Sequence, residues 1–139
     1  AGLGKGGGGM TRAGSRQSPT RLMLIGFAIW LAATVAVRLM GQWLFVPGNG
    51  IVTVLVFVVG AAGMFALMRG LIRRFGPDRP TATAAWLLLP ELFLDGLTLP
   101  TFGLVFPNML PEAAGLFGGW LLVLYGASFL SALTAPGES

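Results

Sequence analysis

The 139-residue chain contains no cysteine and no histidine. The absence of both excludes disulfides, thiolate nucleophiles, Cys/His zinc or iron–sulfur sites and the commonest haem ligand. It also excludes histidine general bases and Ser-His catalytic triads. No other residue pattern indicates a nucleophile, a phosphate-binding loop or a metal site. We therefore expect no cofactor and no metal, and we predict that the protein is not an enzyme.

Charged residues are also scarce. They make up 10% of the chain, whereas a soluble domain carries about 25%. Hydrophobic residues make up 55%, and the mean hydropathy is +0.80. So few polar residues cannot cover a water-facing surface, so lipid must cover part of the protein. The high pI could suggest nucleic acid as a partner, but the basic residues flank apolar runs, as topology signals do. We predict an integral membrane protein that does not bind nucleic acid.

Four long apolar segments, at about residues 22–45, 51–68, 81–106 and 113–133, follow a Gly- and Ser-rich stretch at 1–20. We interpret the stretch at 1–20 as a flexible tail. About 20 helical residues at 1.5 Å each cross a hydrocarbon core of roughly 30 Å. Lipid offers the backbone no hydrogen-bond partners, so spans of this length are helices. The predicted fold class is an all-α membrane protein, in which four transmembrane helices form an antiparallel bundle over residues 21–133, followed by a tail at 134–139.

The basic residues indicate the orientation of this bundle. Eight of the nine lie before the first segment or between the second and the third. The other connections carry none. By the positive-inside rule, both termini face the cytoplasm. The eight residues are Lys5, Arg12, Arg16, Arg21, Arg69, Arg73, Arg74 and Arg79.

Small residues recur at four-residue intervals in three of the segments. Such ridges allow helices to approach closely. We expect them to pack the bundle, with a dimer face as the alternative. The ridges are Ala28, Ala32 and Ala36; Ala62, Ala66 and Gly70; and Gly115 with Gly119.

Three ionisable residues, Arg38, Glu91 and Asp95, lie inside predicted spans. Each costs roughly 2.5–3.5 kcal/mol at the centre of a membrane helix. Glu91 and Asp95 are four residues apart, so they share a helix face, which continues to Thr98. Arg38 and Asp95 come to similar depth on helices that run the same way, and a guanidinium can bind a carboxylate through two hydrogen bonds. We predict that Arg38 pairs with Asp95, in reach of Glu91, and that this buried cluster locks the bundle.

The third segment also carries Pro90 and Pro100. Each proline removes a backbone donor and favours a kink. A kink frees carbonyl groups that then need another partner, which is how transporters build sites in broken helices. Glu91, Asp95 and Thr98 are therefore also a candidate ion or proton site.

The stretch Leu87–Leu130 resembles a bacterial family of short four-helix membrane proteins of unknown function. The likeness rests on Pro90, Asp95, the sequence Phe106-Pro107-Asn108, and the segment from Trp120 to Gly126. The resemblance implies the same four-helix architecture, and it implies no activity. We expect the protein to lie in a bacterial cytoplasmic (inner) membrane. Glu91 has no place in the recognised pattern.

Two functions remain open at this point. The first is an accessory or scaffolding subunit of a larger membrane assembly, whose partners are the lipid bilayer and either other membrane subunits or a second copy. The alternative is a small proton- or cation-coupled transporter that uses Glu91 and Asp95.

Overall fold

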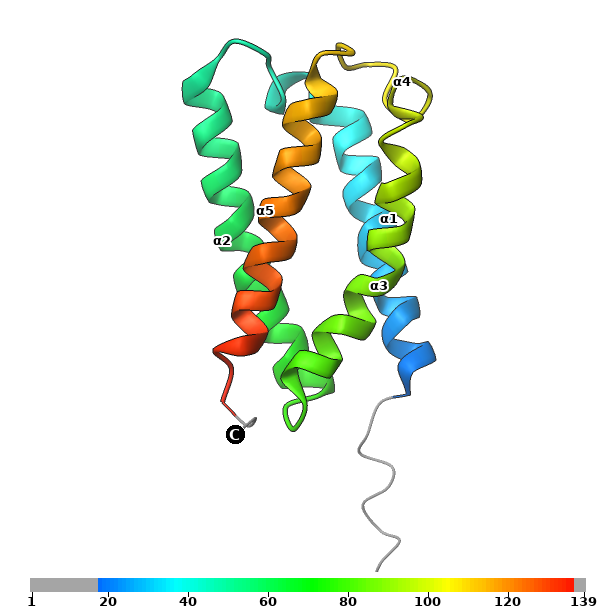
Figure 1. The fold of residues 1–139 in the computed structure, drawn as a ribbon, viewed down its shortest axis with the longest axis vertical. Helices are drawn as coiled ribbons and strands as arrows, with labels where there is room; N and C mark the ends of the chain where they lie inside the picture. The colour runs from blue at the N-terminus through cyan, green and yellow to red at the C-terminus, as the bar shows by residue number, and fades with distance from the viewer. Residues whose placement is uncertain (1–17, 137–139) are drawn as a thin grey trace, which may run out of the picture.

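A computed structural model describes residues 18–136 of the protein (Figure 1). Residues 1–17 and 137–139 of the two predicted tails lie outside this range. Every regular element in the described part is a helix, which confirms the all-α prediction. The helices are α1 (Pro19–Leu44), α2 (Gly50–Phe75), α3 (Pro80–Thr98), the short α4 (Phe102–Val105) and α5 (Ala113–Leu133).

Consecutive long helices run in opposite directions, as the short connections require. The start of α1, the α2–α3 turn and the end of α5 lie at one end of the bundle, and α4 lies at the other (Figure 1). The most extensive contacts are nevertheless between helices that run the same way, since α1 packs mainly on α3 and α2 mainly on α5. The connected helices, α1 with α2 and α3 with α5, contact each other less extensively.

Local signals in the sequence account for the starts of the helices. Ser18 caps α1 by accepting a hydrogen bond from the backbone N–H of Arg21 at 3.2 Å, and Pro19 takes the first helical position. Asn49 caps α2 in the same way, after Gly48 has turned the chain with φ of +87°. Pro80 opens α3.

Two boundaries differ from those expected. The second apolar run ends at Met68, but α2 continues to Phe75. In this extension Ile72 is buried in the core and Arg69 hydrogen-bonds to Ser131 of α5. The third segment is not one helix to residue 106. It ends at Thr98, just before Pro100, and resumes as the separate α4. Pro90 lies inside α3, whose axis changes direction along its length (Figure 1).

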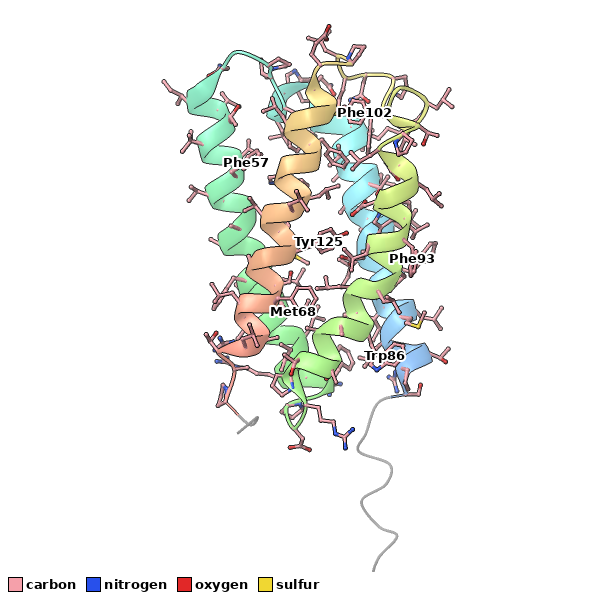
Figure 2. The ribbon with its side chains drawn as sticks, viewed as in Figure 1. Phe57, Met68, Trp86, Phe93, Phe102 and Tyr125 are labelled. Carbon is pink, nitrogen blue, oxygen red and sulfur yellow. The ribbon has the colours of Figure 1, made fainter. Side chains whose placement is uncertain are left out.

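Three helices, α1, α2 and α5, are long and apolar enough to cross a membrane. Their apolar side chains face mostly outward: only 6% of the most apolar stretch of α2 is buried inside the protein. Phe93 on α3 also points away from the bundle (Figure 2). A surface of this kind requires lipid or another protein around it.

Two apolar clusters form the core, one toward each end of the bundle. The first contains Leu22, Met68, Ile72, Ala84, Leu87, Leu88, Ala132 and Ala135. The second contains Val37, Phe45, Phe102, Phe106, Met109, Ala113, Phe117 and Leu121. Tyr125 packs against both clusters. Glu91, Asp95 and Thr98 of α3 therefore form a polar layer between the two apolar clusters.

The small-residue ridges mostly face outward. Six of their eight members are exposed, and the other two, Ala36 and Gly119, are half-buried. The expectation that these ridges pack this bundle is therefore wrong for most of them, and the dimer face stays a prediction. Other glycines make the close approaches: Gly26 lies against the backbone of Leu87 on α3, and Gly60 lies against Trp120 on α5.

Gly26→Ala tests the close contact of α1 with α3. A Cβ at this position would lie 1.9 Å from the carbonyl oxygen of Leu87, so the two helices have to separate. We expect a loss of about 1–3 kcal/mol of stability, as for other overpacked sites. The thermal unfolding midpoint in detergent micelles, followed by circular dichroism, measures the change.

Gly63→Ala on α2 is the matched control, because a Cβ there meets nothing within 4 Å. Alanine also has the higher helix propensity, so its midpoint should stay level or rise. Equal midpoints for the two variants would contradict the packing described for Gly26.

Candidate functional site

A cavity of about 70 Å³ lies in the polar layer between the two apolar clusters. Glu91 and Asp95 of α3 line it, together with Trp30 and Thr34 of α1 and Tyr125 of α5. Figure 2 shows Tyr125 projecting from α5 into the bundle. The remaining wall is apolar and aromatic, formed by Ile29, Ala33, Val37, Met64, Phe117, Trp120, Leu121 and Leu124.

The periodicity of α3 directs its polar residues inward. Glu91, Asp95 and Thr98 share one face, and they are only 6%, 7% and 6% exposed. Their roles differ. Thr98 donates its hydroxyl to the carbonyl of Leu94 in its own helix at 2.8 Å and does not line the cavity. The candidate site therefore contains the two acids and not Thr98.

Asp95 is held by side chains from two other helices. The indole N–H of Trp30 donates to Asp95 Oδ1 at 2.8 Å, and the hydroxyl of Tyr125 donates to Oδ2. Hydrogen bonds to an ionised acceptor are stronger than neutral ones, and a low-dielectric interior strengthens them further. Both oxygens of Asp95 are thus satisfied, and the contact joins α1, α3 and α5.

Glu91 is in a different situation, one turn earlier on the same face. Its carboxyl group has no hydrogen-bond partner within residues 18–136, although the side chain is buried and lines the cavity. Burial away from water, and then the nearby carboxyl group of Asp95, oppose a negative charge at this place. Glu91 is therefore the acid of the cavity whose negative charge no neighbouring group of the described residues would neutralise.

The match to a known family spans most of the described helices. A model described as a family of unknown function (DUF5367) matches residues 44–138. The chain belongs to this family. The expected membership in a domain-of-unknown-function family is thus confirmed, and the matched part includes Glu91, Asp95 and Tyr125 but not Trp30 or Arg38. No curated protein and no solved structure matches the chain.

The predicted pair of Arg38 and Asp95 does not form in this DUF5367 protein. Arg38 is exposed and donates from Nη1 to the carbonyl oxygen of Val105, at the end of α4, at 2.9 Å. Each helical residue turns by about 100°, so Arg38 is rotated away from the buried face that Val37 marks on α1. The guanidinium reaches toward the end of the bundle, as long basic side chains do. The predicted charge lock is therefore wrong.

Sequence reasoning missed the two donors to Asp95. The sequence contains a weak indication of each donor. Tyr125 is the single tyrosine of the chain and stands in an apolar segment. Trp30 lies in the middle of its segment, away from the interfaces that tryptophan favours. A lone polar aromatic in a span needs a partner for its N–H or O–H, and a buried acid is such a partner.

Arg69 is a second residue whose role the sequence did not reveal. It was interpreted as a topology signal in a loop, but it lies in α2 and donates from Nη2 to the carbonyl of Ser131 at 3.2 Å and to Thr134 Oγ1 at 2.8 Å. The hydroxyl of Ser131 donates in turn to the carbonyl of Phe65 at 2.9 Å. These bonds tie the ends of α2 and α5 together, so they have a structural role, away from the cavity.

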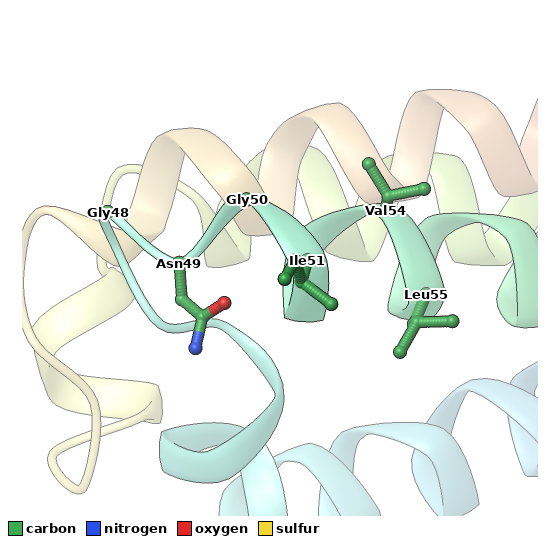
Figure 3. A pocket seen from close by; sticks show the side chains of 6 residues that line it. All are labelled: Gly48, Asn49, Gly50, Ile51, Val54 and Leu55. Carbon is green, nitrogen blue, oxygen red and sulfur yellow. The ribbon is translucent and has the colours of Figure 1, made fainter.

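Another hollow lies at the start of α2 (Figure 3). It is a shallow depression of the outer surface, and its side chains carry no ionisable group. Ile51, Val54 and Leu55 are largely exposed there. Its lining consists of Gly48, Asn49, Gly50, Ile51, Val54 and Leu55. The cavity at Glu91 is therefore the better candidate for a functional site.

Double-mutant cycles test the partners of Asp95. Tyr125→Phe and Asp95→Ala should be coupled by about 0.5–3 kcal/mol, as residues in one hydrogen-bond network are. Arg38→Ala and Asp95→Ala should be additive within about 0.5 kcal/mol, as separate sites are. The free energy of unfolding in mixed SDS micelles measures both cycles. Coupling in the arginine cycle, with additivity in the tyrosine cycle, would restore the pair that the sequence predicted.

Proposed function

We propose that this protein is a small membrane transporter that exchanges protons for a cation at Glu91. In this proposal α1, α2, α3 and α5 are four membrane spans, and both termini face the cytoplasm of a bacterial cell. The basic residues at one end support the orientation: Arg73, Arg74 and Arg79 are exposed around the α2–α3 turn, at the end where α1 begins. No chemical transformation is part of the proposal.

The character of α3 supports its being a fourth span despite its two acids. It has 19 residues and packs on α1 and α5. Leu92, Phe93 and Leu97 face outward and are exposed, whereas Glu91 and Asp95 face inward. Ionisable residues in membrane spans face the bundle interior in this way and mark ion or proton pathways.

The observation that carries the proposal is the buried carboxyl group of Glu91, which has no hydrogen-bond partner within the described residues. An isolated charge buried in an apolar environment is costly, so the group has to be neutralised. The purely structural interpretation assigned this task to Arg38, which instead binds the carbonyl of Val105. A proton or an incoming cation then remains to neutralise Glu91.

Competition at one carboxyl group couples the two fluxes. With its two hydrogen bonds, Asp95 keeps the wall of the cavity in place. Glu91 has no such bonds and can hold either a proton or a cation, but binding one displaces the other. If the cavity opens in turn to the two sides of the membrane, this competition drives one ion against the gradient of the other.

The outward surface of α2 favours a second candidate, the accessory subunit. Ala62, Ala66 and Gly70 form an exposed small-residue ridge on α2, and only 6% of the most apolar stretch of this helix is buried inside the protein. Helices with such ridges associate closely in membranes. Native mass spectrometry of the protein extracted from its own membrane tests this candidate, which predicts a stoichiometric complex with other subunits. A lone chain would contradict it.

Glu91→Gln tests the exchange function. The protein is reconstituted in liposomes with a set pH gradient, and Na⁺, K⁺, guanidinium and tetramethylammonium are added in turn. We expect at least one of them to collapse the gradient through the wild type. The variant should be slower by roughly tenfold or more, because loss of one partner of a buried charge pair costs about 2–5 kcal/mol.

Glu112→Gln is the matched control, because Glu112 is an exposed acid at the start of α5, outside the cavity. It should exchange at the wild-type rate. Exchange that is equally fast in all three proteins, or absent from the wild type with every ion, would contradict the proposal.

A further inference from the structure

The nature of the cavity wall indicates which cation the site would take. Resting on the proposed exchange function, we propose that the substrate is a compact organic cation, an alkylammonium or a guanidinium with one positive charge. It would lie between the carboxylate of Glu91 and the aromatic rings of the cavity. Two carboxyl groups alone would not distinguish a metal ion from an organic cation, so the argument depends on the other lining groups.

Four aromatic side chains line the cavity: Trp30, Phe117, Trp120 and Tyr125. The polar group of each of the three amphipathic ones is already bonded within the protein. Trp30 and Tyr125 donate to Asp95, and the indole N–H of Trp120 donates to the carbonyl of Val56 at 3.2 Å. What these residues can offer an occupant is aromatic surface, which attracts organic cations when they are desolvated.

Oxygen ligands for a metal ion are too few. A hard cation requires about six or more oxygens to replace its hydration shell. In the cavity lining, the side-chain oxygens without a hydrogen bond to a described residue are the two of Glu91 and the hydroxyl of Thr34. The hydroxyl of Tyr125 and both oxygens of Asp95 are already hydrogen-bonded. Within the described residues there is no group of three or more acidic, histidine or cysteine side chains that could hold a metal ion. The aromatic wall therefore suits an organic cation better than an inorganic one.

The size and charge of the site limit the occupant further. A cavity of about 70 Å³ has room for only a few heavy atoms. Glu91 is the single unpartnered acid in its lining, so one positive charge balances it. The exchange is then one proton off Glu91 for one organic cation bound, and the total charge of the site stays constant.

Tryptophan fluorescence can report on the cavity directly. Trp43 and Trp86 are 67% and 38% exposed and do not line the cavity. Replacing both by phenylalanine leaves Trp30 and Trp120, which both line it. The full chain in detergent micelles is titrated with guanidinium, methylammonium, Na⁺ and K⁺ at constant ionic strength. Proton release is followed in parallel with a pH dye in weakly buffered solution.

We expect saturable changes in emission with guanidinium or methylammonium, together with the release of about one proton per bound cation. The apparent affinity should rise by up to about tenfold per pH unit while the proton competes. Na⁺ and K⁺ should give neither signal. Glu91→Gln should lose the response, Glu91→Asp should retain a weaker one, and Glu112→Gln should behave as the parent protein.

The outcomes separate the two proposals. If Na⁺ or K⁺ releases protons and the organic cations do not, the substrate class is wrong while the exchange function stands. If the organic cations bind without releasing protons, the exchange at Glu91 is wrong while the preference of the cavity stands. If none of the four ions changes the emission or the pH of the parent protein, both proposals fail. The comparison of ions in the parent protein does not depend on any variant of Glu91 being folded.

Discussion

The Asp95 carboxylate is the polar contact on which the middle of the bundle depends. Its two oxygens accept hydrogen bonds from Trp30 on α1 and Tyr125 on α5, and it lies between two apolar clusters that pack by contact alone. Apolar side chains gain little specificity in a membrane, because lipid tails are as apolar as they are. A buried carboxylate with two directed donors specifies which helices face one another and at what depth.

The same contact makes the two acids of α3 unequal. Asp95 is engaged by its neighbours, whereas Glu91, one turn away on the same face, lines the cavity without a hydrogen-bond partner within residues 18–136. The polar edges of the surrounding aromatic residues are occupied, so the site combines one available carboxyl group with aromatic walls. A single arrangement of side chains thus gives the bundle its order and leaves one buried carboxyl group without a partner in the described residues.

Much of the architecture could be predicted from local properties. Composition and run length predict a helical membrane protein, because a backbone in lipid has to satisfy its own hydrogen bonds. The four-residue spacing of Glu91 and Asp95 predicts one shared face, and Pro100 predicts a kink in the third segment. The full break between α3 and α4 goes beyond that kink. These features depend on the chain near each residue, so a single sequence is enough to indicate them.

The partners of the buried groups were decided by the tertiary structure. Distance along an axis placed Arg38 level with Asp95, but the packing of α1 on α3 brings Trp30 to the acid, eight residues and roughly 12 Å earlier on α1. Arg38 faces outward and reaches Val105 instead. The same packing makes Gly26 a contact residue and leaves Ala28 and Ala32 exposed. Sequence determines how deep a residue lies on its helix, through a rise that every residue shares. Its depth relative to residues of other helices, and the direction in which it faces them, depend on how the helices pack, which is a property of all of them together.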